Sequence, residues 1–155
     1  MARVAERRDA AELLRLLPHR FPFLFVDSIE VVEAGKHVRG HKRVTGSECL
    51  LHPSSGVPLG WPNLLAIEAL AQTTVGILAD LVDGAEGAIG YFVRMEQVKL
   101  RDPAVPGDSL VLDVELLNAR RGLVRVRGVA RVGERLVARA TFTVALRATA
   151  DKGAA

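Results

Sequence analysis

The sequence predicts an α+β fold, in which a twisted antiparallel β-sheet wraps around one long central helix. The first observation is a helical spacing of apolar residues after position 62, at Leu64, Ile67, Ala71, Val75, Leu78 and Val82. The second is an alternation of apolar and polar residues in the last half of the chain, as in residues 110–116 and 136–146. One long apolar helix beside a run of antiparallel strands is typical of α+β proteins, because the helix and the sheet bury each other.

The length of 155 residues is that of one domain, so we expect a single domain over residues 1–155, with frayed ends at 1–8 and 149–155. The chain is 49% hydrophobic and 25% charged, which excludes the disordered and low-complexity classes. Its net charge is only +3, so the composition requires no nucleic-acid partner. The single cysteine, Cys49, excludes an intrachain disulfide and a cysteine-based metal site.

The most apolar stretch, residues 61–82, is long enough to suggest a membrane span. Glu68, Gln72 and Asp80 interrupt it, so a buried helix of a soluble protein fits better. The first residues lack the apolar core of a signal peptide. We therefore expect a cytoplasmic protein with no membrane span.

The first third of the chain predicts a short helix followed by two strands. Asp9 and Glu12 form a capping-box pattern, and Pro18 ends the helix that they begin. Residues 17–23 contain two prolines and should be extended. Strands are expected over 24–32 and 37–44, with a turn between them, and residues 45–62 are expected to be a loop.

The remaining chain predicts the long helix and then only strands. The helix begins at Pro62 or Asn63 and is expected to stop at Asp83-Gly84. Strands are expected over 88–94 and 98–100, with a break at 95–97. Turns at 103–108, 120–122 and 133–134 separate the three strands that follow.

Four segments resemble, in order, the signatures of bacterial 3-hydroxyacyl-[acyl-carrier-protein] dehydratases. They are residues 17–27 (LPHRFPFLFVD), 67–72 (IEALAQ), 90–92 (GYF) and 103–108 (PAVPGD). The resemblance covers roughly residues 13–146 and implies the hotdog fold of that family. It also implies a lyase of fatty-acid biosynthesis or of a related polyene or polyketide route, which converts 3-hydroxyacyl thioesters to trans-2-enoyl thioesters.

The family places its active site at a dimer interface, with a loop histidine from one subunit and a helix carboxylate from the other. The histidine removes the proton next to the thioester, and the acid protonates the departing 3-hydroxyl. These residue types suit the reaction, because the base must work near neutral pH and hydroxide leaves only when it is protonated. Backbone N–H groups near the helix start hold the thioester oxygen. Glu68 matches the family's carboxylate.

The loop departs from the family pattern at the histidine. Counting from Glu48 or from Glu68 places residues 53–56 (PSSG) where the family has Gly-His-Phe-Pro, so Ser54 stands at the histidine position. A serine needs an activating partner to act as a base. His52 lies two residues upstream on the same side of an extended chain, and we expect it to serve as the base.

Substrate contacts are expected from Ser54, Gly56, Trp61, Asn63, Gln72 and Phe92. Asn63 replaces a family glycine at the helix start but still supplies a backbone N–H and a good cap. Trp61 either shapes the mouth of the acyl tunnel or fills the core. His19 is expected to stabilise its loop rather than to react.

The expected partners are an acyl carrier protein, or a coenzyme A thioester, and a second copy of the chain. The protein would be a homodimer or, as a trimer of dimers, a hexamer. No cofactor or metal is expected, although the substrate carries a phosphopantetheine arm. Arginines on neighbouring strands form either a solvated face or a docking site for an acidic carrier protein, and they are Arg120, Arg121, Arg125, Arg127, Arg131 and Arg139.

Two other functions remain open at this stage. The missing loop histidine allows a catalytically silent subunit that pairs with an active relative. A hydrolase is the other alternative, because hotdog acyl-thioesterases also use a carboxylate on the central helix.

Overall fold

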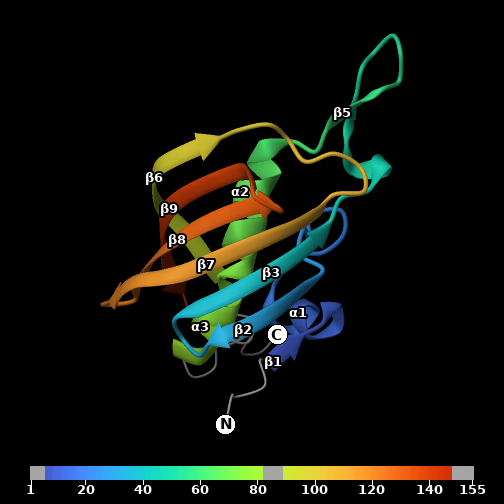
Figure 1. The fold of residues 1–155 in the computed structure, drawn as a ribbon. Coiled ribbons are helices and arrows are strands. Elements are labelled where there is room, and N and C mark those ends of the chain that lie inside the picture. Colours follow the sequence, from blue (N-terminus) through green and yellow to red (C-terminus); the bar gives the residue numbers. More distant parts are fainter. Residues whose placement is uncertain (1–5, 82–88, 148–155) are drawn as a thin grey trace, which may run out of the picture.

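The computed structural model describes residues 6–81 and 89–147 and contains one large curved sheet (Figure 1). Its seven strands follow the order β1-β2-β3-β7-β8-β9-β6, and every neighbouring pair is antiparallel. The strands are β1 (Glu6–Arg8), β2 (Ser28–Glu33), β3 (His37–Arg43), β6 (Ile89–Leu100), β7 (Ser109–Arg120), β8 (Leu123–Val132) and β9 (Arg135–Arg147).

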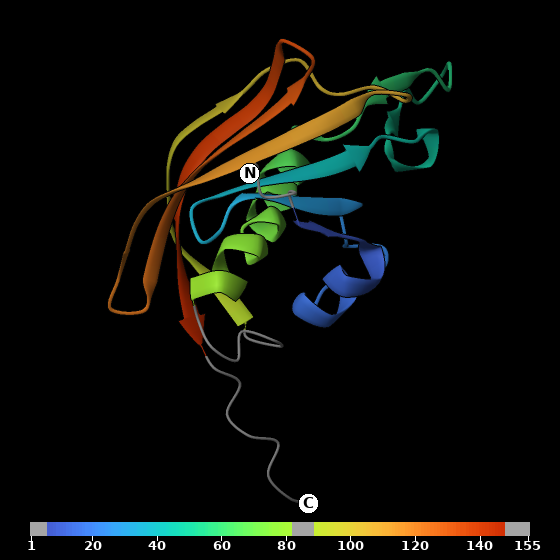
Figure 2. The same ribbon diagram turned by 60° about the horizontal axis from the view of Figure 1, so that its bottom comes forward.

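The central helix lies in the concave side of this sheet, as Figures 1 and 2 show. It consists of α2 (Asn63–Thr73) and α3 (Val75–Leu81), which meet at Thr74 with its backbone still helical (φ −58°, ψ −21°). The hydroxyls of Thr73 and Thr74 donate to carbonyls one turn back, at 2.8 and 3.0 Å. The predicted long helix is confirmed, and its expected stop at residues 83–84 lies outside the described residues.

Small residues on the sheet let the helix approach closely. A Cβ at Gly40 would come within 2.4 Å of the Thr73 hydroxyl, and one at Gly128 would come within 3.1 Å of Leu70. Leu70 is fully buried there, and α2 as a whole packs against β3, β7, β8 and β9. The α2–α3 segment is long and apolar enough to cross a membrane, but 61% of its most apolar window is buried, as expected for the core helix of a domain.

The N-terminal elements cover the open end of this core. In α1 (Ala10–Leu16), the Asp9 carboxylate accepts the Glu12 N–H and the Glu12 carboxylate accepts the Asp9 N–H, so the predicted capping box is confirmed. Leu13 anchors the helix in the core.

The expectation that residues 1–8 are frayed is wrong for Glu6–Arg8, because β1 pairs with β2. The expected frayed end at 149–155 lies outside the described residues.

Two expectations about strands need correction. Residues 89–100 form one strand, not two, because the break expected at 95–97 is accommodated by shifts in register against β9 and a positive φ (53°) at Gln97. Residues 45–62 are not only loop, since they contain a 3-10 turn, η1 (Gly46–Glu48), and a hairpin of β4 (Leu50–Leu51) and β5 (Pro58–Gly60). This hairpin projects away from the sheet (Figures 1 and 2).

Candidate active site

A cavity of about 230 Å³ lies between the N-terminal segment, the central helix and strand β6. Most of its wall is apolar, with Leu17, Val75 and Leu78 among the lining residues. The ionisable side chains in the wall are His19, Glu68 and Tyr91. An apolar hollow with a few convergent polar groups is the usual form of a small-molecule site, and this one suits an acyl chain with a reactive head.

Glu68 lies in the second turn of α2, and its side chain is 22% exposed. Its Oε1 accepts a hydrogen bond of 2.9 Å from Nε2 of Gln72, one helical turn later. Among the described residues, no hydrogen bond reaches Oε2. The carboxyl is therefore held through one oxygen, while the other accepts no hydrogen bond from the described residues.

Gln72 is only 2% exposed and uses its whole amide group inside the protein. Its Oε1 accepts the Phe25 N–H at 2.9 Å, and its Nε2 donates to the Phe23 carbonyl at 2.9 Å as well as to Glu68. Gln72 lines the cavity, but its amide connects Glu68 to the segment before β2, and its expected contact with substrate stays a prediction.

His19 is the histidine that the fold brings to Glu68. Its Nε2 lies 3.4 Å from Glu68 Oε1, and its ring stacks on Phe23 with a centroid distance of 6.2 Å. The sequence did not predict this approach, because strands β2 and β3, the 3-10 turn and the β4–β5 hairpin all lie between His19 and Glu68 in the chain. The only available signal was the motif that contains His19.

His52, Ser54 and Gly56 lie together on the exposed hairpin between β4 and β5. The Ser54 hydroxyl and His52 Nδ1 are 3.1 Å apart, and Gly56 has the positive φ (67°) that the turn requires. Among residues 6–81 and 89–147, no hairpin residue lines the cavity that contains Glu68. Within one protomer, His52 is therefore not brought to the carboxyl.

Of the other expected contacts, Phe92 lies in the cavity wall, whereas Trp61 and Asn63 do not line the cavity. Phe92 lines the cavity and packs edge-on against Phe142, with ring centroids 5.4 Å apart. Trp61 is fully buried against Phe25, which corresponds to the core-filling alternative. Asn63 begins α2, and its side-chain amide donates to the Arg101 carbonyl. Pro62 provides no side-chain cap, so the first N–H groups of α2 are not satisfied by it.

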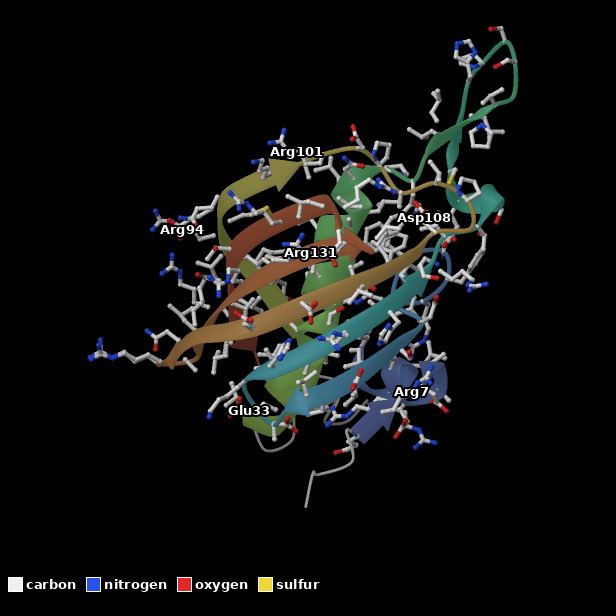
Figure 3. The ribbon with its side chains drawn as sticks, in the orientation of Figure 1. Arg7, Glu33, Arg94, Arg101, Asp108 and Arg131 are labelled. Carbon is white, nitrogen blue, oxygen red and sulfur yellow. The ribbon has the colours of Figure 1, made fainter. Side chains whose placement is uncertain are left out.

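Two other surfaces lack the features of an acyl site. A larger, open hollow of about 580 Å³ over β2 and β3 is lined mainly by polar and charged residues, including Glu30 and His41. On the outer face of the sheet, Arg127 pairs with Glu115 at 2.6 Å and Arg125 with Glu96 at 3.2 Å. Figure 3 shows Arg131 on this outer face, opposite the helix. In the described part of the chain, no three metal-ligating side chains come together.

Comparison with known proteins identifies close relatives of this chain. The FabA-like domain family matches residues 17–141. The 3-hydroxyacyl-[acyl-carrier-protein] dehydratase FabZ of Blochmanniella pennsylvanica is 41% identical over 139 residues, which cover 88% of this chain and 91% of the relative. The enzyme of the same name from Yersinia enterocolitica is 42% identical over 137 residues, or 86% of this chain and 80% of the relative.

Solved structures agree with the fold. The dehydratase heterocomplex ApeI:P from Xenorhabdus doucetiae has a TM-score of 0.67 at 17% identity, and the match covers 88% of this chain and 91% of that one. A hot-dog-like protein from Thermanaerovibrio acidaminovorans has a TM-score of 0.60 at 23% identity, with coverage of 75% and 84%. The chain therefore has the hotdog fold and belongs to the FabA-like family of 3-hydroxyacyl-[acyl-carrier-protein] dehydratases.

Proposed function

We propose that this protein dehydrates 3-hydroxyacyl thioesters on an acyl carrier protein to trans-2-enoyl thioesters. The observation that carries the proposal is the Glu68 carboxyl, which Gln72 holds through one oxygen in the wall of an apolar cavity of about 230 Å³. The acyl chain would occupy the apolar part of the cavity, and Oε2 of Glu68 would protonate the departing 3-hydroxyl. The dehydratase relatives support the same reaction.

The remaining chemistry needs a base and donors for the thioester oxygen. Charge moves from C2 towards the thioester carbonyl as the proton leaves, and backbone N–H groups at the start of α2 are suited to stabilise it. No step requires a cofactor, because both proton transfers use side chains. His52, the base predicted from the sequence, would have to enter the site from the hairpin of a second subunit.

A homodimer would form through strand β6 and the β4–β5 hairpin. Strand β6 is the long edge of the sheet, and it exposes Tyr91, Phe92, Val93, Met95 and Val98. The hairpin exposes Leu50, Leu51, Val57 and Leu59. An exposed edge with apolar side chains is rare in a monomer, because it invites pairing with another chain. A pair of domains joined there would cover both surfaces.

A silent or half-active subunit is the second candidate, and Ser54 is the observation that favours it. If the partner in the dimer were a relative with a histidine at this position, that relative's hairpin would complete the site around Glu68. The similarity to the ApeI:P dehydratase heterocomplex supports such pairing. In this case the purified chain alone would not dehydrate its substrate.

The test is to identify the products formed by the purified protein from 3-hydroxyacyl thioesters on acyl carrier protein and on coenzyme A. Mass spectrometry distinguishes loss of water, with the thioester intact, from release of a free thiol. Enoyl thioester formed faster from the carrier-protein substrate is the expected result. Free thiol without enoyl product would contradict the proposal in favour of a thioesterase, and no product would favour the silent subunit.

A further inference from the structure

The segment before β2, residues 17–27, is held by hydrogen bonds that do not involve the His19 imidazole. The Arg20 guanidinium donates to the carbonyls of Leu17 and His19, both at 2.8 Å. Gln72 holds the next part of the segment through the backbone of Phe23 and Phe25. The backbone of this segment is therefore held by hydrogen bonds from Arg20 and Gln72, and among the described residues none of these bonds comes from the His19 imidazole.

The two ring nitrogens of His19 are free of the bonds that a structural histidine makes. Nδ1 is buried and has no hydrogen-bond partner among the described residues, whereas most buried polar atoms in proteins have one. Nε2 lies 3.4 Å from Glu68 Oε1, slightly beyond the usual hydrogen-bond range. The ring is held in place by stacking on Phe23, so its position is defined while its nitrogens remain available.

His19 and Glu68 both line the apolar cavity, from opposite elements of one protomer. The other candidate histidine, His52, lies on the hairpin beside Ser54 and outside this cavity. The reaction needs one base at C2 and one acid at the 3-hydroxyl, on neighbouring carbons of the substrate. His19 Nε2 and Glu68 Oε1 lie 3.4 Å apart, so the imidazole and the carboxyl are both within reach of adjacent carbons of one substrate.

We propose that His19, rather than His52, is the catalytic base of this protein, and this inference rests on the proposed dehydration. Nε2 of His19 takes the C2 proton, and the electron pair of the C–H bond forms the C2–C3 double bond. The C3–O bond breaks, and the oxygen leaves as water with the proton of Glu68. Imidazolium and carboxylate then stand side by side, and transfer of the proton from Nε2 to Glu68 restores both groups.

The proposal gives a physical reason why Ser54 can replace the family histidine. An acid–base pair inside one protomer does not need a base delivered by the hairpin of a partner. The hairpin would then serve for contact between subunits, and its exposed apolar residues suit that task.

The experiment separates the base step from dehydration. The wild type and three variants, His19→Gln, His52→Gln and His41→Gln, are assayed for enoyl formation from 3-hydroxyacyl carrier protein. The same proteins are incubated in D₂O with the saturated acyl carrier protein, and mass spectrometry follows deuterium uptake at C2. His41→Gln is the matched control, because His41 lies outside the cavity beside Glu30. Thermal unfolding shows whether each variant is folded.

His19→Gln is expected to lower the dehydration rate by about 10²- to 10⁴-fold, the usual contribution of a general base, and to stop C2 exchange. His52→Gln and His41→Gln should keep both reactions. The inference is overturned if folded His19→Gln retains both reactions, or if His52→Gln abolishes them. Absence of dehydration by the wild type would overturn the proposed function itself, and the inference with it.

Discussion

At the scale of single residues, the site depends on one buried amide. Gln72 satisfies the Phe25 N–H and the Phe23 carbonyl and positions Oε1 of Glu68, so three parts of the structure meet at one side chain. A buried polar group without its partner costs roughly 1 to 3 kcal/mol, which makes such a residue hard to replace. Both the stability of the segment before β2 and the geometry of the carboxyl depend on it.

Replacing Gln72 with Leu should destabilise the protein by about 2 to 4 kcal/mol, because two backbone groups lose their partner in the interior. It should also reduce dehydration, since Glu68 is no longer held. Urea denaturation measures the first effect and a steady-state assay the second. Unchanged stability would show that the backbone groups of Phe23 and Phe25 do not depend on the amide.

The sequence predicted the carboxyl of this site but not its surroundings. Glu68 was identified by its motif, and the four-residue spacing to Gln72 places both side chains on one helix face. The contact between Glu68 and His19 depends on how the N-terminal segment folds back across the helix. Local sequence patterns contain no information on such a long-range contact.

At the scale of elements, an ion pair fixes the base of the hairpin. Lys42 on β3 donates to Glu48 at 2.6 Å, while the hydroxyl and the N–H of Thr45 donate to the same carboxylate at 2.8 and 3.0 Å. Burial alone would raise the pKa of Glu48, but the hydrogen bonds from Lys42 and Thr45 outweigh it and lower the pKa below its usual value. The ionised carboxylate therefore stabilises the folded state.

Glu48→Gln should lower the free energy of unfolding by roughly 1 to 2 kcal/mol at neutral pH, because the partly exposed, charged hydrogen bond with Lys42 is lost. Because the pKa of Glu48 is lower in the folded than in the unfolded chain, its contribution is complete above the unfolded pKa. The contribution disappears as the pH falls through the folded pKa. The stability difference between wild type and variant, measured by denaturation from pH 7 to pH 3, should shrink on acidification. A constant difference would contradict this account.

Element prediction succeeded where the pattern was local. The capping box of α1 lies within one segment and was found in the expected place. In the central helix Ile67, Val75 and Leu78 are buried as expected, whereas Leu64 is 70% exposed. The expectations for the hairpin and for β6 were wrong because tertiary pairing decides them. Gln97 stays within β6 through its shifted register against β9, although its own neighbours suggest a break.

At the scale of the whole molecule, the edge of the sheet formed by β6 is uncovered in the single chain. The sheet order ends at β6, which exposes large apolar residues along most of its described length. The fold class could be predicted from the sequence, but the strand order could not, because β6 follows the helix in the chain and pairs with the last strand, β9. A chain of antiparallel strands allows several such orders.

Val93→Lys should convert the proposed dimer to a monomer, because it places a charge in the middle of the β6 surface. Val93 is 58% exposed in the single chain, and Val32 on β2, with 44% exposure, provides the matched control Val32→Lys. Light scattering coupled to gel filtration measures the mass of each species. A monomeric wild type, or a Val93→Lys variant that remains a dimer, would show that β6 is not the interface.

The acid role of Glu68 is tested by comparing the dehydration rates of the wild type, Glu68→Gln and Glu33→Gln. A glutamine at position 68 can still accept the hydrogen bond from Gln72, so Glu68→Gln removes the acid but keeps this hydrogen bond. Glu33 is exposed and pairs with Lys36, which makes it a control for charge alone. The rate of enoyl-thioester formation, followed by absorbance, should fall about 10²- to 10⁴-fold for Glu68→Gln. It should remain unchanged for Glu33→Gln. Full activity of a folded Glu68→Gln protein would contradict the assignment of Glu68 as the acid.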